Sequence, residues 1–89
     1  MAFEPENAPL EVLKCATKHG LSALKIEHAW RSAVAMRYRD FTIPSVIAAA
    51  GVDSHHRLIE MLGAEQESGA IVVFHAMQLT EKMANELGL

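Results

Sequence analysis

The sequence lacks most of the features that mark secreted, membrane-spanning or disulfide-stabilised proteins. It contains one cysteine, Cys15, so no disulfide can form within the chain. Residues 1–6 are acidic and have neither the basic nor the apolar segment of a signal peptide. The longest apolar stretch, 70–79, is about half as long as a membrane span and is interrupted by polar side chains. Because one unpaired cysteine suits a reducing compartment, we expect a cytoplasmic protein that does not cross a membrane.

Charge of one sign is also scarce. The chain has 11 acidic side chains against 8 Lys and Arg, which gives a formal net charge of −3 at pH 7. This balance is not the strongly basic one that is typical of proteins that bind polyanions. Protonation of all five histidines would change the net charge from −3 to +2, so the affinity for a charged partner could depend on pH.

The composition is otherwise that of a globular domain. Hydrophobic residues make up 51% of the 89 residues, far from the composition of a disordered chain. The length suits one domain, so we expect a loose lead-in over residues 1–6 and a single helical domain over residues 7–89. A domain of this size has a thin core, and association with a second copy is a common source of additional stability. We therefore expect a homodimer.

Capping residues and glycines divide the domain into short helices. Ser22 is a good N-cap, and Gly20 before it is a good helix stop. The β-branched run 71–73 is the one segment that could form a strand, but the helical spacing of the apolar residues after it favours a helix. The predicted fold is all-α, a compact bundle of four to five short helices at 8–19, 23–39, 43–50, 54–62 and 68–87.

Residues 42–62 have the pattern of two helices joined by a glycine turn. The pattern consists of aliphatic residues around a small residue and a glycine, at Val46, Ala50, Gly51, Val52 and Leu58. The glycine permits a left-handed turn, and the small alanine lets two helices approach each other. The segment resembles the helix-turn-helix of bacterial transcriptional regulators, most closely the TetR-like form.

The resemblance implies that residues 53–61 form a recognition helix in the major groove of double-stranded DNA. The side chains that it places on bases and phosphates are Thr42, Ser45, Ser54, His55, His56 and Arg57. The sequence departs from the pattern at Ile47, where alanine is usual, and Glu60 lies one turn behind the single arginine of the reading surface. A helical corner without a role in DNA binding fits the same residues.

The last predicted helix has more apolar surface than four short helices can easily cover. Its apolar side chains could form a dimer seam or a protein-binding face, at Ile71, Val72, Phe74, Ala76, Leu79 and Met83. The same pattern also fits a helix that runs through the centre of the domain.

Sites for metals or catalysis are not evident. Glu11, Cys15 and His19 would share one face of a helix, and a Cys/His pair at this spacing can bind zinc or activate a thiol. The sequence shows no second pair of ligands, and covalent catalysis needs a base, an orienting group and an oxyanion hole around a cleft. We therefore expect no metal, no cofactor, no small-molecule substrate and no enzymatic activity.

Two functions follow from these observations. The first is a small, dimeric DNA-binding regulator of the bacterial or phage helix-turn-helix type. The alternative is a non-enzymatic helical module that binds another protein, as an adaptor or inhibitor, through its C-terminal helix.

Overall fold

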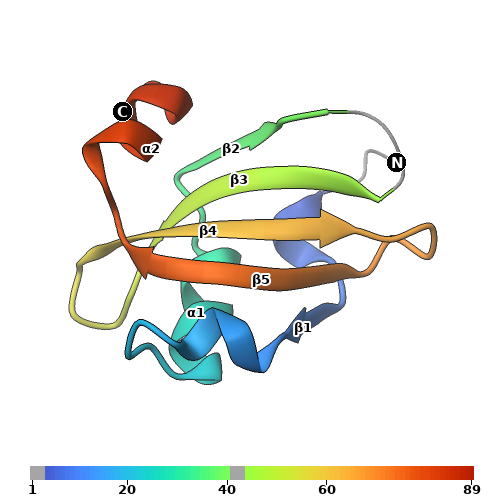
Figure 1. Ribbon diagram of the computed structural model, residues 1–89, viewed down its shortest axis with the longest axis horizontal. Helices are drawn as coiled ribbons and strands as arrows, with labels where there is room; N and C mark the ends of the chain where they lie inside the picture. Colours follow the sequence, from blue (N-terminus) through green and yellow to red (C-terminus); the bar gives the residue numbers. More distant parts are fainter. Residues whose placement is uncertain (1–3, 41–43) are drawn as a thin grey trace.

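The computed structural model describes residues 4–40 and 44–89, and these form an α/β fold (Figure 1). Within these residues, five strands form one sheet in the order β1-β5-β4-β3-β2, with β1 parallel to β5 and the other pairs antiparallel. The strands are β1 (Leu10–Val12), β2 (Ala35–Tyr38), β3 (Ser45–Val52), β4 (Leu58–Glu65) and β5 (Ile71–Gln78). The helices are α1 (Ala23–Arg31) and α2 (Glu81–Leu87), with 3-10 turns η1 (Pro5–Asn7) and η2 (Lys14–Thr17). The prediction of an all-α bundle is therefore wrong.

The predicted helix-turn-helix is replaced by a β-hairpin. Strands β3 and β4 occupy the positions of its two helices and pair from Ser45↔Glu65 to Val52↔Leu58. A recognition helix is therefore not formed by residues 53–61, and the expected first residue of the motif, Thr42, lies outside the described residues. A strand that is buried on both faces has no polar alternation, so its apolar run can be mistaken for part of a helix.

Helix α1 covers one face of the sheet. Its residues Ile26, Ala29 and Trp30 are fully buried, and the indole Nε1 of Trp30 donates a hydrogen bond of 3.0 Å to the carbonyl of Pro5. Gly51, expected in a turn, lies instead in β3 beneath this helix. A Cβ atom on Gly51 would lie 1.7 Å from the carbonyl oxygen of Ala29, so only glycine permits this approach of helix and strand.

The opposite face of the sheet is partly covered by α2. This helix contacts β2 and β3 and buries Met83, while the Arg39 guanidinium forms two 2.7 Å hydrogen bonds with the Glu86 carboxylate. Ala48 and Ala50 of β3 are fully buried, although they point away from α1. No helix within residues 4–40 and 44–89 is long and apolar enough to cross a lipid bilayer.

The apolar stripe assigned to the last helix belongs to two elements. Residues 71–78 form β5, and the helix α2 begins only at Glu81, after the N-cap Thr80. The chain itself covers Ile71, Ala76 and Met83, whereas Val72, Phe74 and Leu79 are partly buried. The core of the domain thus accounts for most of the pattern that suggested a helical partner surface.

Candidate functional site

The connection between β3 and β4, residues 53–57, is a tight turn that Asp53 organises. Its Oδ1 accepts hydrogen bonds from the backbone N–H groups of His55 (2.8 Å) and Arg57 (2.9 Å). The backbone hydrogen bond from Arg57, followed by that from His55, keeps the pKa of Asp53 below its ordinary value. Asp53 therefore acts as a carboxylate that fixes the loop, while the side chains of His55, His56 and Arg57 are exposed.

One residue of this turn has an unusual backbone conformation. His56 has φ 61°, in the left-handed region that favours glycine, and no other described non-glycine residue has a positive φ. This conformation costs a non-glycine residue about 1 kcal/mol or more. Backbone conformations of this kind cluster at binding and active sites.

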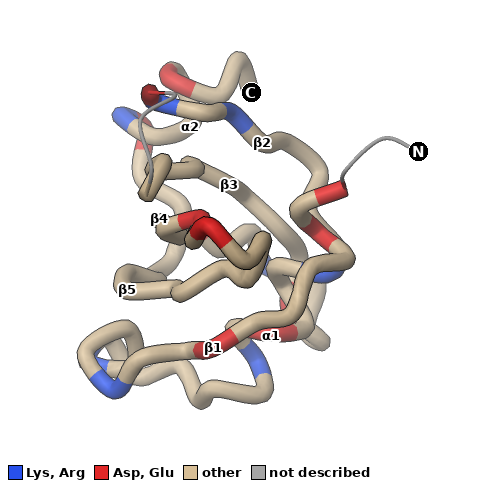
Figure 2. The backbone as a smooth tube through the Cα atoms, turned by 90° about the vertical axis from the view of Figure 1, so that its right-hand side faces the viewer, with Lys and Arg blue, Asp and Glu red and all other residues tan. Residues whose placement is uncertain are grey.

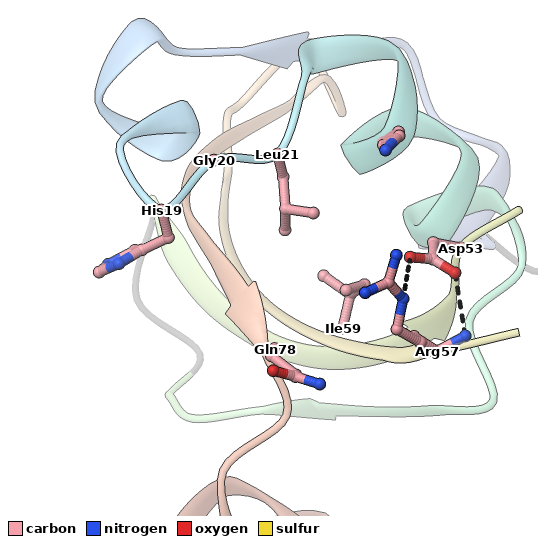
Figure 3. Close-up of a pocket in the computed structure, with 8 residues that line it drawn as sticks. His19, Gly20, Leu21, Asp53, Arg57, Ile59 and Gln78 are labelled. Atoms are coloured by element: carbon pink, nitrogen blue, oxygen red, sulfur yellow. Dashed lines mark hydrogen bonds and ion pairs between the residues drawn. The ribbon is translucent and has the colours of Figure 1, made fainter. Parts of the chain in front are cut away.

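A cavity of about 230 Å³ lies beside the turn (Figure 3). It is lined by two cationic side chains, one carboxylate, two apolar side chains, two neutral polar side chains and a glycine: Lys25, Arg57, Asp53, Leu21, Ile59, His19, Gln78 and Gly20. Leu21, Ile59 and the guanidinium of Arg57 point toward one another, whereas the ring of His19 points away from the centre (Figure 3). Arg57 is 60% exposed and its Nε lies 3.7 Å from Oδ2 of Asp53.

The side chain of Lys25 forms no ion pair with any residue in the described parts of the chain. Lys25 belongs to the first turn of α1. Gly20 and Leu21, just before this helix, also line the cavity, which shows that the helix begins beside it. The hydroxyl of Ser22 accepts a hydrogen bond of 3.2 Å from the backbone of Lys25, so the predicted N-cap is confirmed. The cavity therefore has an available lysine ammonium and the positive end of a helix at its wall.

A second polar cluster lies on the opposite face of the sheet, where Glu60 and Thr80 line a recess together with Met83 of α2. The buried carboxylate of Glu60 accepts hydrogen bonds from the Thr80 hydroxyl (2.6 Å) and backbone N–H (2.9 Å), and its Oε2 lies 2.9 Å from Nε2 of His75. Burial raises the pKa of Glu60, but the hydrogen bonds from Thr80 and His75 outweigh it and hold the pKa below its ordinary value. Glu60 thus stays charged and orients the imidazole of His75.

His19 connects the two groups of residues. It lines the cavity, and its ring contacts the ring of His75 edge to face, with centroids 5.9 Å apart. Sequence reasoning missed the pairing of Glu60 and His75, since both were expected on solvent-facing sides of separate helices. The signal that could have indicated this pairing is the presence of one polar residue within each of two otherwise apolar segments, Glu60 in 58–65 and His75 in 71–78.

The predicted DNA-contacting residues have different fates in the structure. Four of them are exposed side by side in the β3–β4 turn: Ser54, His55, His56 and Arg57. They lie together because they are adjacent in the sequence, and not because they share one face of a helix. Ser45 is only 3% exposed and lies at the start of β3, where it cannot contact a large ligand.

Charge is distributed unevenly over the molecule. We define the basic end as His19, Lys25, His55, His56 and Arg57, around the β3–β4 turn. The β4–β5 turn lies at the opposite end of the sheet and contains only acidic charges (Figure 1). Lys and Arg also gather around α2 and β2, where Arg39 is paired with Glu86 (Figure 2).

The helix face expected for Glu11, Cys15 and His19 does not exist, because Glu11 lies in β1 and Cys15 in η2. The Cys15 thiol donates a hydrogen bond of 3.4 Å to the carbonyl of Phe74. Within residues 4–40 and 44–89, no group of three or more His, Cys, Asp or Glu side chains is arranged to hold a metal ion. No family model, curated protein or solved structure matches this chain.

Proposed function

We propose that the protein binds nucleic acid through its basic end. The observation that supports this most directly is the convergence of Lys25 and Arg57, from different elements, on one cavity beside three histidines of which two are in the exposed turn. Lysine and arginine side chains are the main ligands of nucleic-acid phosphates. In a chain with a net charge of −3, this local concentration of cationic groups is not a consequence of composition.

Three further features favour a phosphate ligand. The start of α1 lies at the cavity, and helix N-termini attract anions through their free N–H groups and dipole. The acidic β4–β5 turn lies at the far end of the sheet. A polyanion that binds at the basic end therefore stays away from these negative charges. The backbone of His56 is left-handed, a conformation in which glycine would be more stable, and the residue nevertheless adds an imidazole to the exposed turn of the basic end.

This proposal retains the predicted nucleic-acid ligand but replaces the means of contact. A β-hairpin turn and a helix N-terminus, in place of a recognition helix, would approach the phosphate backbone. We infer that the protein acts in the cytoplasm, where its single thiol would stay reduced.

The test is fluorescence anisotropy with labelled duplex DNA, single-stranded DNA and single-stranded RNA, each titrated from low to high salt. We expect affinity to fall steeply with salt, and the double variant Lys25→Ala with Arg57→Ala to bind at least about tenfold more weakly. Lys82→Ala, an exposed lysine of α2 at the other cationic region, is the matched control. Equal binding by the native protein and a folded double variant would contradict the proposal.

A second candidate function is the cleavage of RNA at the same end, which departs from the expectation of a non-enzyme. It is favoured by the contact between His19 and His75 and by the carboxylate of Glu60 that orients one of them. Two imidazoles can serve as general base and general acid. In such a step the 2′-oxygen attacks phosphorus while one imidazole takes its proton. The bond to the 5′-oxygen then breaks and that oxygen receives a proton from the other imidazole, which leaves a cyclic phosphate and a 5′-hydroxyl.

End-labelled RNA followed by gel electrophoresis tests this candidate. We expect His19→Ala and His75→Ala each to slow cleavage by at least about a hundredfold, while His28→Ala, an exposed histidine of α1, has no effect. RNA that stays intact with the native protein, or is cut equally by the folded variants, would rule the candidate out and leave binding as the proposed function.

A further inference from the structure

The cavity at the basic end has walls that a phosphate does not need. Its volume of about 230 Å³ is below the roughly 300–1,000 Å³ of pockets that enclose a drug-sized ligand. Leu21 and Ile59 contribute apolar side chains, and Ile59 is only 3% exposed, so it forms part of the floor. A phosphate alone gains nothing from apolar walls, because they remove its water without replacing its hydrogen bonds.

The rim of the cavity has polar groups of another kind. Gln78, at the end of β5, is exposed and its side-chain amide forms no hydrogen bond with the described residues. An amide of this kind has donors and an acceptor and can pair with the edge of a base. Figure 3 shows Gln78 beside Ile59, with the guanidinium of Arg57 on the other side of that floor.

These features together suit a planar, aromatic ligand with polar edges that is attached to a phosphate. We infer that the cavity takes one unpaired nucleobase of a single-stranded nucleic acid. Leu21 and Ile59 would contact the base, the amide of Gln78 would pair with its edge, and Lys25 and Arg57 would hold the flanking phosphates. This inference rests on the proposed binding of nucleic acid and specifies the form of the ligand.

Single-strandedness follows from geometry. A base within a duplex is stacked and paired, so it can enter a walled cavity only if it is first taken out of the stack. A single strand has no such cost, and stacking of its bases on protein side chains adds affinity with little dependence on sequence. The strand would run across the mouth of the cavity with its backbone toward the exposed turn.

The experiment compares the native protein and two exposed-residue variants on three labelled probes of equal length: a single strand, the same strand in a duplex, and a strand of abasic sugar phosphates. Native protein should bind the base-containing single strand at least about tenfold more tightly than the duplex or the abasic strand. Gln78→Leu should weaken binding of the base-containing strand severalfold and leave abasic binding unchanged. Asn85→Leu, on exposed α2, is the control.

The outcomes separate this inference from the proposed function. Salt-sensitive binding that is equal for all three probes would support phosphate binding and overturn the base-binding cavity. An equal loss on the base-containing and abasic strands in Gln78→Leu would also overturn it, since the amide would then act on the backbone. No binding of any probe would overturn both.

Discussion

Two turns of the sheet have the same hydrogen-bonding pattern and different side chains. In each, the N–H of the first residue donates to the carbonyl of the fifth, and the N–H of the fourth donates to the carbonyl of the first. The donor–acceptor distances are 2.9 and 3.0 Å in the turn 53–57, and 2.8 and 2.9 Å in the turn 66–70. The fourth residue is left-handed in both: His56 with φ 61° and Gly69 with φ 89°.

The two turns differ in the side chain at the fourth position. Glycine adopts this conformation without steric cost, and the usual three-residue hairpin places it there. The turn at the acidic end of the sheet follows that rule. The turn at the basic end instead has a histidine whose side chain is exposed, at a cost of about 1 kcal/mol. We interpret this cost as the consequence of a surface built for binding.

The two turns are also held in different ways. The carboxylate of Asp53 anchors the first from within, through backbone N–H groups. The second has a weaker bond of this kind, in which the Ser68 hydroxyl accepts a 3.3 Å hydrogen bond from the backbone N–H of Ala70. It is also tied from outside, where Glu65 accepts a hydrogen bond of 2.7 Å from the Tyr38 hydroxyl of the edge strand β2. Burial, together with this hydrogen bond and the charge of Glu65, raises the pKa of Tyr38 to about 12.

The largest expected effect concerns the strand that leads into the first turn. Gly51→Ala should destabilise the protein by about 3 kcal/mol or more, because the new Cβ meets rigid backbone of α1 at 1.7 Å. Urea unfolding measures the loss. Val52→Ala, the next and half-buried position of β3, is the comparison and should cost about 1 kcal/mol. Equal stabilities of the two variants would show that α1 can move away from β3.

Removal of the carboxylate that orients His75 has the next largest effect. Glu60→Gln should cost about 2 kcal/mol at neutral pH, because charge-assisted hydrogen bonds from Thr80 and His75 are weakened in a buried site. Glu60 has a lowered pKa in the folded protein, so its contribution is present above pH 4.5, its ordinary value, and is lost as the pH falls through the folded value.

The gap in stability between the native protein and Glu60→Gln should therefore narrow on acidification, as measured by urea unfolding over a pH series. Glu67→Gln, in the exposed part of the second turn, is the control and should follow the native curve. A gap that is the same at all pH values would show that the charge of Glu60 contributes nothing.

Gly69→His makes the second turn resemble the first. It should destabilise the protein by about 1 kcal/mol, because a side chain is introduced at a left-handed position. Thermal unfolding measures the change, with Glu67→His, at another exposed residue of the same turn, as the control. A loss no greater than that of the control would mean that the two turns tolerate side chains equally and that His56 is not strained.

The reverse exchange has the smallest effect on stability. His56→Gly should stabilise the protein by about 0.5 kcal/mol through relief of the left-handed conformation, which is partly offset by the greater freedom of glycine in the unfolded chain. It should also weaken nucleic-acid binding, whereas His56→Asn keeps a residue that tolerates this conformation and separates the two effects. A destabilised His56→Gly would show that the imidazole supports the fold.

The sequence allowed some local features to be predicted. The N-cap at Ser22 is confirmed, and Gly20 is left-handed as a stop requires, although it ends a 3-10 turn and not a long helix. The exposure of Ser54, His55, His56 and Arg57 in one place also follows from their adjacency. Such features depend on hydrogen bonds and conformations that span only a few residues, so the residues themselves specify them.

The fold was decided by contacts that the sequence does not display. Ala48, Ala49 and Ala50 favour a helix by propensity, yet they form an interior strand of the sheet, since α1 covers one face of β3 and α2 lies on the other. The run Ile71–Val73 indicated a strand, but the helical spacing of the later apolar residues favoured a helix. Those residues in fact belong to two elements, β5 and α2, which are separated by Leu79 and Thr80.

The cavity and the pairing of Glu60 with His75 also depend on tertiary contacts, because their residues come from elements far apart in the chain. Short-range signals therefore determined caps and turns, whereas tertiary structure decided strand against helix and assembled the site. The physical reason is that an apolar segment can be buried either as a helix or as a strand, with a similar gain in hydrophobic free energy. Which of the two forms depends on the distant residues that cover its faces.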